Sequence, residues 1–228
     1  AIPDRLAQLL DVSVYNASMG GTCAARLETE RRLDSAKGSL SLVGLTGAIR
    51  SGDFDVQQTA RIRDSNTESF PEIIDGLAEV DFGQVEVALI QKGVNDYHGG
   101  VPIDNEEDPY DEYTFLGALR SAVRDLRRVN PHIRILFITP TYTWYTATGL
   151  TCEETDNGAG VLEDYVNAQL GLAEELDVEA IDLYHDFFPH ESWEDWKESM
   201  MDGLHPNEAG RERIAERIAD ILRSEKKQ

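Results

Sequence analysis

Residues 112–139 read EYTFLGALRSAVRDLRRVNPHIRILFIT and contain two hydrophobic patterns in succession. The apolar residues of the first part recur at helical spacing: Phe115, Leu116, Leu119, Val123 and Leu126. This spacing predicts an amphipathic helix over Glu112–Val129, punctuated by Pro131. The run Ile133–Thr139 is short and largely apolar, which predicts a buried strand that stops at Pro140. An amphipathic helix leading into an apolar strand is typical of α/β folds.

The same alternation continues on both sides of this stretch. Strands are predicted at Val12–Tyr15, Val85–Ile90 and Val178–Leu183, and helices at Pro3–Leu10, Phe70–Val80, Val161–Leu176 and Glu208–Arg223. A helix start is expected within Cys23–Arg32 and a helical turn within Trp193–Met200, whereas Leu40–Asp53 and Thr141–Gly160 are expected to be mainly loop. Together these elements predict a three-layer α/β/α, flavodoxin-like architecture with a mostly parallel sheet. No Pro/Gly/Ser-rich linker divides the chain, so residues 1–228 are interpreted as one domain.

The composition disfavours several classes of partner. Lys and Arg number 21 against 43 Asp and Glu, which gives a net charge of −22. Such a surface repels phosphate backbones and anionic lipids, so neither nucleic acid nor a membrane is expected as a partner. The longest apolar runs are also too short to cross a bilayer, and a soluble protein is expected. The spacing of Cys and His fits no structural metal site, and no cofactor is expected.

The cysteines and the N-terminus leave two questions open. Cys23 and Cys152 are too few for a disulfide framework, and the sequence does not fix whether they are bridged. The start Ala1-Ile2-Pro3-Asp4 has no basic or apolar leader segment, so nothing indicates secretion. A start at Ala1 nevertheless suggests that something upstream was removed, and the compartment stays undetermined.

Three motifs carry the chemistry. Asp202-Gly203-Leu204-His205 places a carboxylate three residues before an imidazole, which suits a general base oriented by an acid. Gly93-Val94-Asn95-Asp96 follows a predicted strand, where the Asn95 amide is able to donate to a developing oxyanion. The Gly-bearing loop Ser18–Thr22 follows another predicted strand and exposes backbone N–H groups. Each motif alone is equally typical of an ordinary turn.

In this order on an α/β scaffold, the three motifs resemble the SGNH, or GDSL-like, hydrolase family. The resemblance covers the chain from about Ala1 to the last helix. It implies that Asp202 orients His205, the catalytic base, and that Gly21 N–H and the Asn95 side chain form the oxyanion hole. It further implies a serine-dependent hydrolase of carboxylic esters, an esterase or acylhydrolase acting on small ester substrates such as acylated carbohydrates or lipids, without a metal.

The nucleophile motif of the family, Gly-Asp-Ser, does not occur in this sequence. The family places it at the end of a first strand, upstream of the Gly loop, and that strand is also missing. Loss of an interior strand would leave backbone groups unpaired at about 1–3 kcal/mol each, so an upstream segment is expected in the natural protein. Ser18 follows a strand and precedes glycines, and it is retained as an alternative nucleophile if its hydroxyl reaches His205.

Two other functional classes remain open: a non-catalytic binding protein on the same scaffold, suggested by the missing motif, and a flavodoxin-like nucleotide binder. The aromatic residues Tyr142, Trp144 and Tyr145 are expected either to line a substrate pocket or to pack the loop. His98 lies close enough to Asn95 in sequence to touch substrate. The spacing of His185, Asp186 and His190 matches no standard metal site, and the carboxylates of Asp104–Glu112 do not fit a calcium loop.

Overall fold

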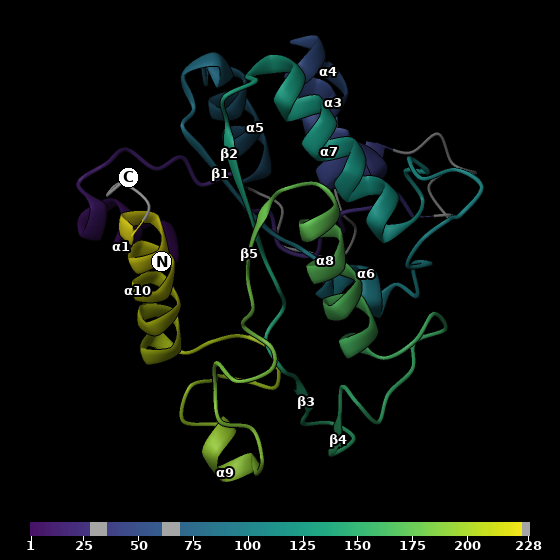
Figure 1. Cartoon of the computed structure of the whole chain (residues 1–228), viewed down its shortest axis with the longest axis vertical. Helices are drawn as coiled ribbons and strands as arrows, with labels where there is room; N and C mark the ends of the chain where they lie inside the picture. The colour runs from purple at the N-terminus through teal and green to yellow at the C-terminus, as the bar shows by residue number, and fades with distance from the viewer. Residues whose placement is uncertain (28–35, 61–68, 225–228) are drawn as a thin grey trace.

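Three parallel strands form the main sheet in the computed structural model, which describes residues 1–27, 36–60 and 69–224 (Figure 1). They are β1 (Val87–Gln91), β2 (Arg134–Ile138) and β5 (Glu179–Ile181), in the order β1-β2-β5. Val87 lies opposite Arg134, and Leu136 lies opposite Glu179. The predicted α/β fold with a parallel sheet is confirmed.

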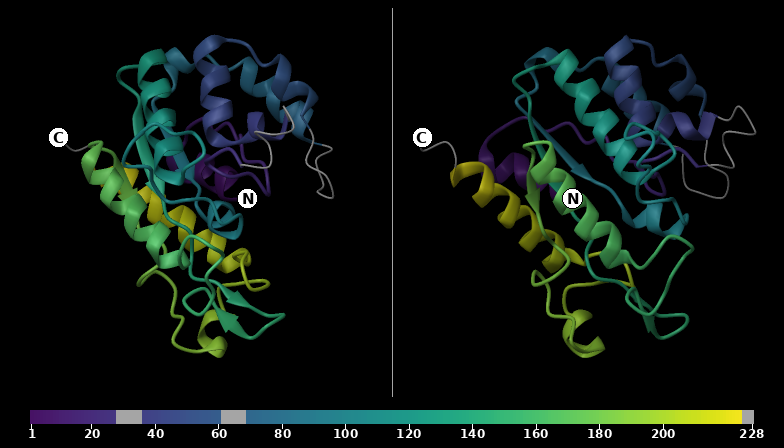
Figure 2. Two further views of the ribbon diagram at one scale, coloured as in Figure 1. Left: turned by 90° about the vertical axis from the view of Figure 1, so that its right-hand side faces the viewer. Right: turned by 45° about the vertical axis from the view of Figure 1, so that its right-hand side comes forward.

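Helices cover this sheet. The longer ones are α1 (Ile2–Leu10), α3 (Leu42–Ser51), α5 (Phe70–Ala78), α7 (Phe115–Val129), α8 (Leu162–Glu175) and α10 (Glu208–Ser224). The shorter ones are α4 (Asp55–Thr59), α6 (Val94–His98) and α9 (Trp193–Trp196), with 3-10 turns at Ala36–Leu40 and Phe82–Gln84. α1 packs against α10, while α3 packs against α7 and α7 also contacts α8. Figure 2 shows the α1–α10 pair and the α7–α8 pair on opposite sides of the strands.

The β1–α7–β2 unit forms because its local signals agree. The hydroxyl of Thr114 caps α7 by accepting from Gly117 N. Basic residues in the last turn interact favourably with the negative end of the helix dipole. The apolar stripe of α7 is buried, as is β2 from Ile135 to Ile138. Because β2 is the central strand, it is covered on both faces and reads as a continuous apolar run. Parallel pairing then places the carboxyl ends of β1, β2 and β5 at one end of the sheet.

β1 is an edge strand within the described residues. The carbonyl oxygen of Glu86 accepts from Arg134 N, so the backbone groups of Glu86, Ala88 and Ile90 point toward β2. Those of Val87 and Leu89 consequently point outward, where no described strand pairs with them. The side chains of Val87, Ala88 and Leu89 are only partly buried, although parallel sheets are usually covered on both faces.

Two expectations from the sequence are wrong, and a third needs a smaller correction. Val12–Tyr15 is not a strand, because no described backbone pairs with it; Tyr15 instead donates from its hydroxyl to Ile73 O of α5 at 2.6 Å. Val12, Val14 and Tyr15 are 38–44% exposed. Leu40–Asp53 is not mainly loop, because Ser41 caps the helix α3 there.

The third difference concerns the loop Thr141–Gly160. It contains a two-stranded antiparallel hairpin, β3 (Trp144–Tyr145) and β4 (Leu150–Thr151). The start of the predicted Cys23–Arg32 helix is not helical up to Leu27, and its remainder lies outside the described residues. No helix in the described part of the chain is long and apolar enough to cross a membrane.

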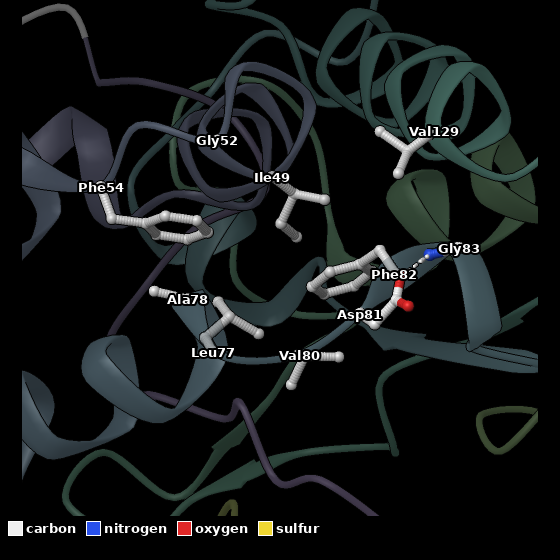
Figure 3. Close-up of a pocket in the computed structure, with 10 residues that line it drawn as sticks. All are labelled: Ile49, Gly52, Phe54, Leu77, Ala78, Val80, Asp81, Phe82, Gly83 and Val129. Atoms are coloured by element: carbon white, nitrogen blue, oxygen red, sulfur yellow. Dashed lines mark hydrogen bonds between the residues drawn. The ribbon is translucent and has the colours of Figure 1, made fainter.

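The buried apolar residues form two clusters. The larger one surrounds the sheet and includes Phe115, Leu136 and Ile214. The smaller one joins α3, α4 and α5 and includes Leu40 and Ile74. A cavity of about 210 Å³ lies between the carboxyl-terminal parts of α3, α5 and α7 (Figure 3). Its lining residues are Ile49, Gly52, Phe54, Leu77, Ala78, Val80, Asp81, Phe82, Gly83 and Val129. It adjoins the segment that precedes β1, so it is remote from the loops that carry the three motifs.

Candidate active site

The Asp202–His205 motif forms a tight turn just before α10. The Oδ2 atom of Asp202 lies 2.9 Å from His205 Nδ1, and Oδ1 accepts from the backbone N–H groups of Leu204 and His205 at 2.9 and 2.8 Å. Met201 N donates to His205 O at 2.7 Å and closes the turn. Partial burial alone would raise the pKa of the Asp202 carboxyl, but these hydrogen bonds outweigh it and the pKa lies below its usual value. The predicted acid and base are therefore in contact.

The His205 ring is accessible at its other nitrogen, Nε2. The His205 side chain is 63% exposed, and its Nε2 has no hydrogen-bond partner among the described residues. The Asn207 side chain accepts from Gly210 N at 2.9 Å, which caps the N-terminus of α10 and fixes the end of the turn. A histidine held at Nδ1 by a carboxylate and accessible at Nε2 has the arrangement of a general base.

Asn95 and the Gly20–Gly21 loop come together from distant parts of the sequence. Gly93 adopts φ of 124°, a conformation that favours glycine, and starts the short helix α6 that carries Asn95. Asn95 Nδ2 donates to Thr22 O at 3.2 Å. A side-chain amide has two N–H donors, so the second remains available. No described acceptor takes the N–H of Gly21, whose φ is 75°.

Asp96 holds the chain just after the same loop, at Ala24 and Ala25. Its buried carboxylate accepts from Ala24 N at 3.0 and 2.9 Å and from Ala25 N at 2.9 Å. Burial raises the pKa of this carboxyl, although the backbone N–H groups and Lys92 act in the opposite direction. Adjacent residues of one motif thus hold the chain at Thr22 and at Ala24–Ala25.

Lys92, the first residue after β1, makes a third connection to this loop. Its Nζ donates to Thr22 Oγ1 at 2.6 Å and to Thr22 O at 3.1 Å. The Thr22 hydroxyl in turn donates to Met19 O at 2.8 Å. Burial lowers the pKa of the Lys92 ammonium, with Asp96 and Cys23 acting the other way. Sequence analysis did not assign a role to Lys92 or Thr22; a lysine at the end of an apolar strand was the available signal.

The β3–β4 hairpin links the two halves of the site. Trp144 N donates to Gly203 O at 3.1 Å, inside the Asp202–His205 turn. At the same hairpin, the hydroxyl of Tyr145 lies 2.9 Å from His98 Nε2, one turn of α6 beyond Asn95. Figure 1 shows the hairpin beyond the carboxyl ends of β1 and β2. Tyr142 is buried and stacks on His190 at 4.1 Å, so it packs the loop, whereas Trp144 and Tyr145 are half-buried.

Ser18 does not contact the base in this arrangement. It is exposed, its N–H donates to Asn16 Oδ1 at 3.1 Å, and no hydrogen bond joins its hydroxyl to His205. The condition set by the sequence for Ser18 as nucleophile is therefore not met.

A second Asp–His pair follows β5. His185 Nδ1 lies 2.6 Å from Asp182 Oδ2, and His185 Nε2 lies 3.6 Å from Glu163 of α8. Because both ring nitrogens face carboxylates, this histidine joins α8 to the end of β5 and is not free to act as a base. Within the described residues no group of three or more His, Cys, Asp or Glu side chains is placed to hold a metal. Cys23 and Cys152 are buried and are not bridged to each other.

Comparison with known proteins identifies the family of the chain. A sequence model of the GDSL-like Lipase/Acylhydrolase family matches residues 1–213. The chain belongs to this family. One crystal structure is 30% identical to this GDSL-like protein, covers 72% of this chain and 74% of its own, and has a TM-score of 0.56. A protein from Lactobacillus plantarum is 26% identical over 62% of this chain and 68% of its own, with a TM-score of 0.54.

The fold extends to more distant structures. A possible lipase from Chitinophaga pinensis is 20% identical over 86% of this chain and 91% of its own, with a TM-score of 0.50. This likeness shows that the two proteins share a fold. No curated protein sequence matches the chain.

Proposed function

We propose that this GDSL-like hydrolase cleaves small carboxylic esters through an acyl-enzyme. In this proposal His205 is the general base, Asp202 orients it, and Gly21 N–H and Asn95 Nδ2 donate to the oxyanion. The observation that carries the proposal is the contact of Asn95 with Thr22, because it brings the Asn95 amide to the residue that directly follows Gly21. Preorganised donors of this kind stabilise the charge of a tetrahedral intermediate.

The reaction divides into two transfers. A serine hydroxyl attacks the ester carbonyl while His205 Nε2 takes its proton, and the carbonyl electrons move onto the oxygen held by Gly21 and Asn95. The intermediate collapses, the bond to the alcohol breaks, and the alcohol oxygen takes the proton from His205. Water then repeats the sequence on the acyl-serine and releases the acid. Asp202 holds the imidazole through Nδ1 and stabilises its protonated form.

The serine is expected from the family resemblance. It is not identified within the 228 residues, because they contain no Gly-Asp-Ser. We place it on a segment outside residues 1–228 that pairs with the outer edge of β1. This placement is supported by the outward backbone groups of Val87 and Leu89, which no described strand pairs with, and by their partly buried side chains. The carboxyl end of such a parallel strand would lie beside Gly93, next to the proposed oxyanion donors.

Labelling with a fluorophosphonate tests the proposal. The probe forms a covalent bond to an activated serine, and intact mass with peptide mapping identifies the modified residue. Labelling of a serine outside residues 1–228, in protein prepared with its native N-terminus, is the expected result. Labelling of Ser18 would overturn the assignment of the Gly loop to oxyanion binding.

His205→Ala provides the second test. We expect turnover of an activated ester to fall by several orders of magnitude, because the serine loses its base. His132→Ala is a matched control, since His132 precedes β2 at the opposite end of the sheet. Near-normal turnover in His205→Ala would show that another group removes the proton.

A non-catalytic binding protein is the second candidate, favoured by the missing Gly-Asp-Ser alone. It predicts binding of an ester or its alcohol without hydrolysis. Absence of fluorophosphonate labelling in folded protein with its native N-terminus would support this candidate against the enzyme.

A further inference from the structure

We propose that Lys92 is the positioning residue of the oxyanion hole: its ammonium group holds the Gly20–Gly21 loop so that Gly21 N–H and Asn95 Nδ2 point to the same oxygen. This inference rests on the proposed ester hydrolysis and adds to it a residue outside the three motifs. Lys92 contacts no substrate in this role and acts through Thr22.

The geometry that supports it is a chain of hydrogen bonds. Lys92 Nζ donates to Thr22 Oγ1 at 2.6 Å, and Thr22 Oγ1 donates to Met19 O at 2.8 Å. The two acceptors lie on either side of Gly20 and Gly21, so the chain closes the loop at its base. No atom lies within 4 Å of the position that a Cβ would take at Gly20, so close packing does not fix the loop there.

A second set of bonds ties this loop to Asn95. The Thr22 carbonyl accepts from Lys92 Nζ at 3.1 Å and from Asn95 Nδ2 at 3.2 Å. Because one oxygen takes both donors, the position of Thr22 sets the rotation of the Asn95 amide and therefore the direction of its second N–H. Lys92 and Asn95 are also three residues apart, so β1 and the Gly93 turn fix their relative position.

The setting of Lys92 is unusual for a structural lysine. Lysine is almost never buried unless it is paired. Lys92 is partly buried. Its charge interacts with the buried carboxylate of Asp96 without a direct ion pair among the described residues, and its hydrogen bonds go to Thr22. Desolvating a cation is costly, and an apolar side chain of similar length would fill the same space without that cost. Because Lys92 bonds to Thr22 and attracts the carboxylate that holds Ala24 and Ala25, its ammonium group fits a role in holding the loop more closely than a role in packing.

The test uses Lys92→Met, which keeps the length of the side chain and removes its donors, and Thr22→Val, which keeps its shape and removes its hydroxyl. Both variants are made in protein that reacts with fluorophosphonate. Each is expected to lower kcat by about tenfold to a hundredfold with little change in KM, because a displaced donor weakens binding of the transition state and leaves substrate binding intact. Thr22→Ser keeps the hydroxyl and should retain most of the activity.

The double variant makes the test specific. If Lys92 acts through Thr22, Lys92→Met combined with Thr22→Val should be no slower than the worse single variant. Lys197→Met is the matched control, because Lys197 is exposed and, among the described residues, pairs with Glu194 one turn earlier in the chain. Multiplying effects in the double variant, or a change confined to KM, would overturn the proposal.

A readout that needs no turnover separates this inference from the proposed function. In residues 1–228, the NMR signals of the Gly21 amide and the Asn95 side-chain amide should shift in Lys92→Met and Thr22→Val while signals from α10 stay in place. If these signals shift but the protein hydrolyses no ester, the positioning role of Lys92 in the loop stands and the proposed ester hydrolysis is contradicted. Unchanged Gly21 and Asn95 signals would overturn the positioning role, even in an active enzyme.

Discussion

Asn95 Nδ2 lies 3.2 Å from the carbonyl oxygen of Thr22, a residue 73 positions earlier in the chain. This one contact joins the loop after β1 to the loop that carries Gly20 and Gly21. Each side keeps a donor for a ligand, since one amide hydrogen of Asn95 and the N–H of Gly21 are not taken up by described acceptors. In the proposed mechanism the two loops would form one donor site before any ligand is present, as electrostatic preorganisation requires.

Asn95→Ala should reduce turnover of an activated ester by about 10²–10³-fold, the usual effect of removing one oxyanion donor. The change should appear in kcat, because the donor acts mainly on the charge that develops in the transition state. Steady-state kinetics of the fluorophosphonate-reactive protein provides the measurement. Asn105→Ala, in an exposed loop, is the control and should be near normal. Equal loss in both variants would indicate a general effect on folding.

The candidate site residues and the residues around them differ in how far the sequence alone points to them. Asp202, His205, Gly21 and Asn95 are identified by short local motifs whose spacing survives folding. Thr22 ends the Gly-bearing loop and Lys92 directly precedes Gly93, but no motif gives either residue a role, and their contact spans 70 residues that local patterns do not encode. Pairs of this kind become visible only when the sheet places the loop ends together.

The fold shows the same division. α7 and β2 were predicted well because hydrophobic period, capping and turn signals agree there. Val12–Tyr15 has the composition of a strand, but a strand also needs a partner with free backbone groups, and no described segment supplies one. For α3, the glycines Gly44 and Gly47 suggested a loop. The Cβ position of Gly44 lies 2.6 Å from Gly38 O, so this glycine allows close packing of the helix.

Gly203→Ala should destabilise the protein and displace the hairpin. A Cβ at this position would lie 2.1 Å from Trp144 O, so either the Asp202–His205 turn or β3 must move. Overpacking of this kind costs about 1–3 kcal/mol. We expect a lower Tm together with slower turnover, measured by thermal unfolding and by ester hydrolysis.

Gly47→Ala is the matched control for this substitution. Gly47 lies within α3, and nothing approaches its Cβ position within 4 Å. Alanine stabilises an open helical position by about 0.5–1 kcal/mol relative to glycine. Gly47→Ala should therefore raise Tm slightly and leave activity unchanged. If Gly203→Ala behaved in the same way, the hairpin would not constrain the catalytic turn.

The Asp182–His185 pair predicts a pH dependence of stability. Burial alone would lower the pKa of His185, but the hydrogen bond that its ring donates to Asp182 and the charges of Asp182 and Glu163 raise it above its usual value. The group gains protons more readily in the folded state, so its stabilising contribution is fully present below about pH 6.5, the unfolded value. It is lost as the pH rises through the raised folded pKa.

His185→Gln should remove this component. Because the pair is about one-third exposed, we expect a difference of about 0.5–1 kcal/mol between wild type and His185→Gln at pH 6, which disappears as the pH rises through the raised folded pKa. Urea unfolding at several pH values measures it, with His132→Gln as control. A constant difference between wild type and His185→Gln across this range would mean that the imidazole charge does not contribute.

Hydrogen exchange at β1 tests whether another strand belongs at its outer edge. Ala88 and Ile90 face β2, so their amides should be protected in residues 1–228, while those of Val87 and Leu89 should exchange faster because they point outward. In protein with its native N-terminus, a strand paired with this edge would protect all four amides. Residue-resolved NMR exchange compares the two forms. Equal protection of Val87 and Ala88 in residues 1–228 alone would show that this edge is already covered, and the serine would then have to reach His205 by another route.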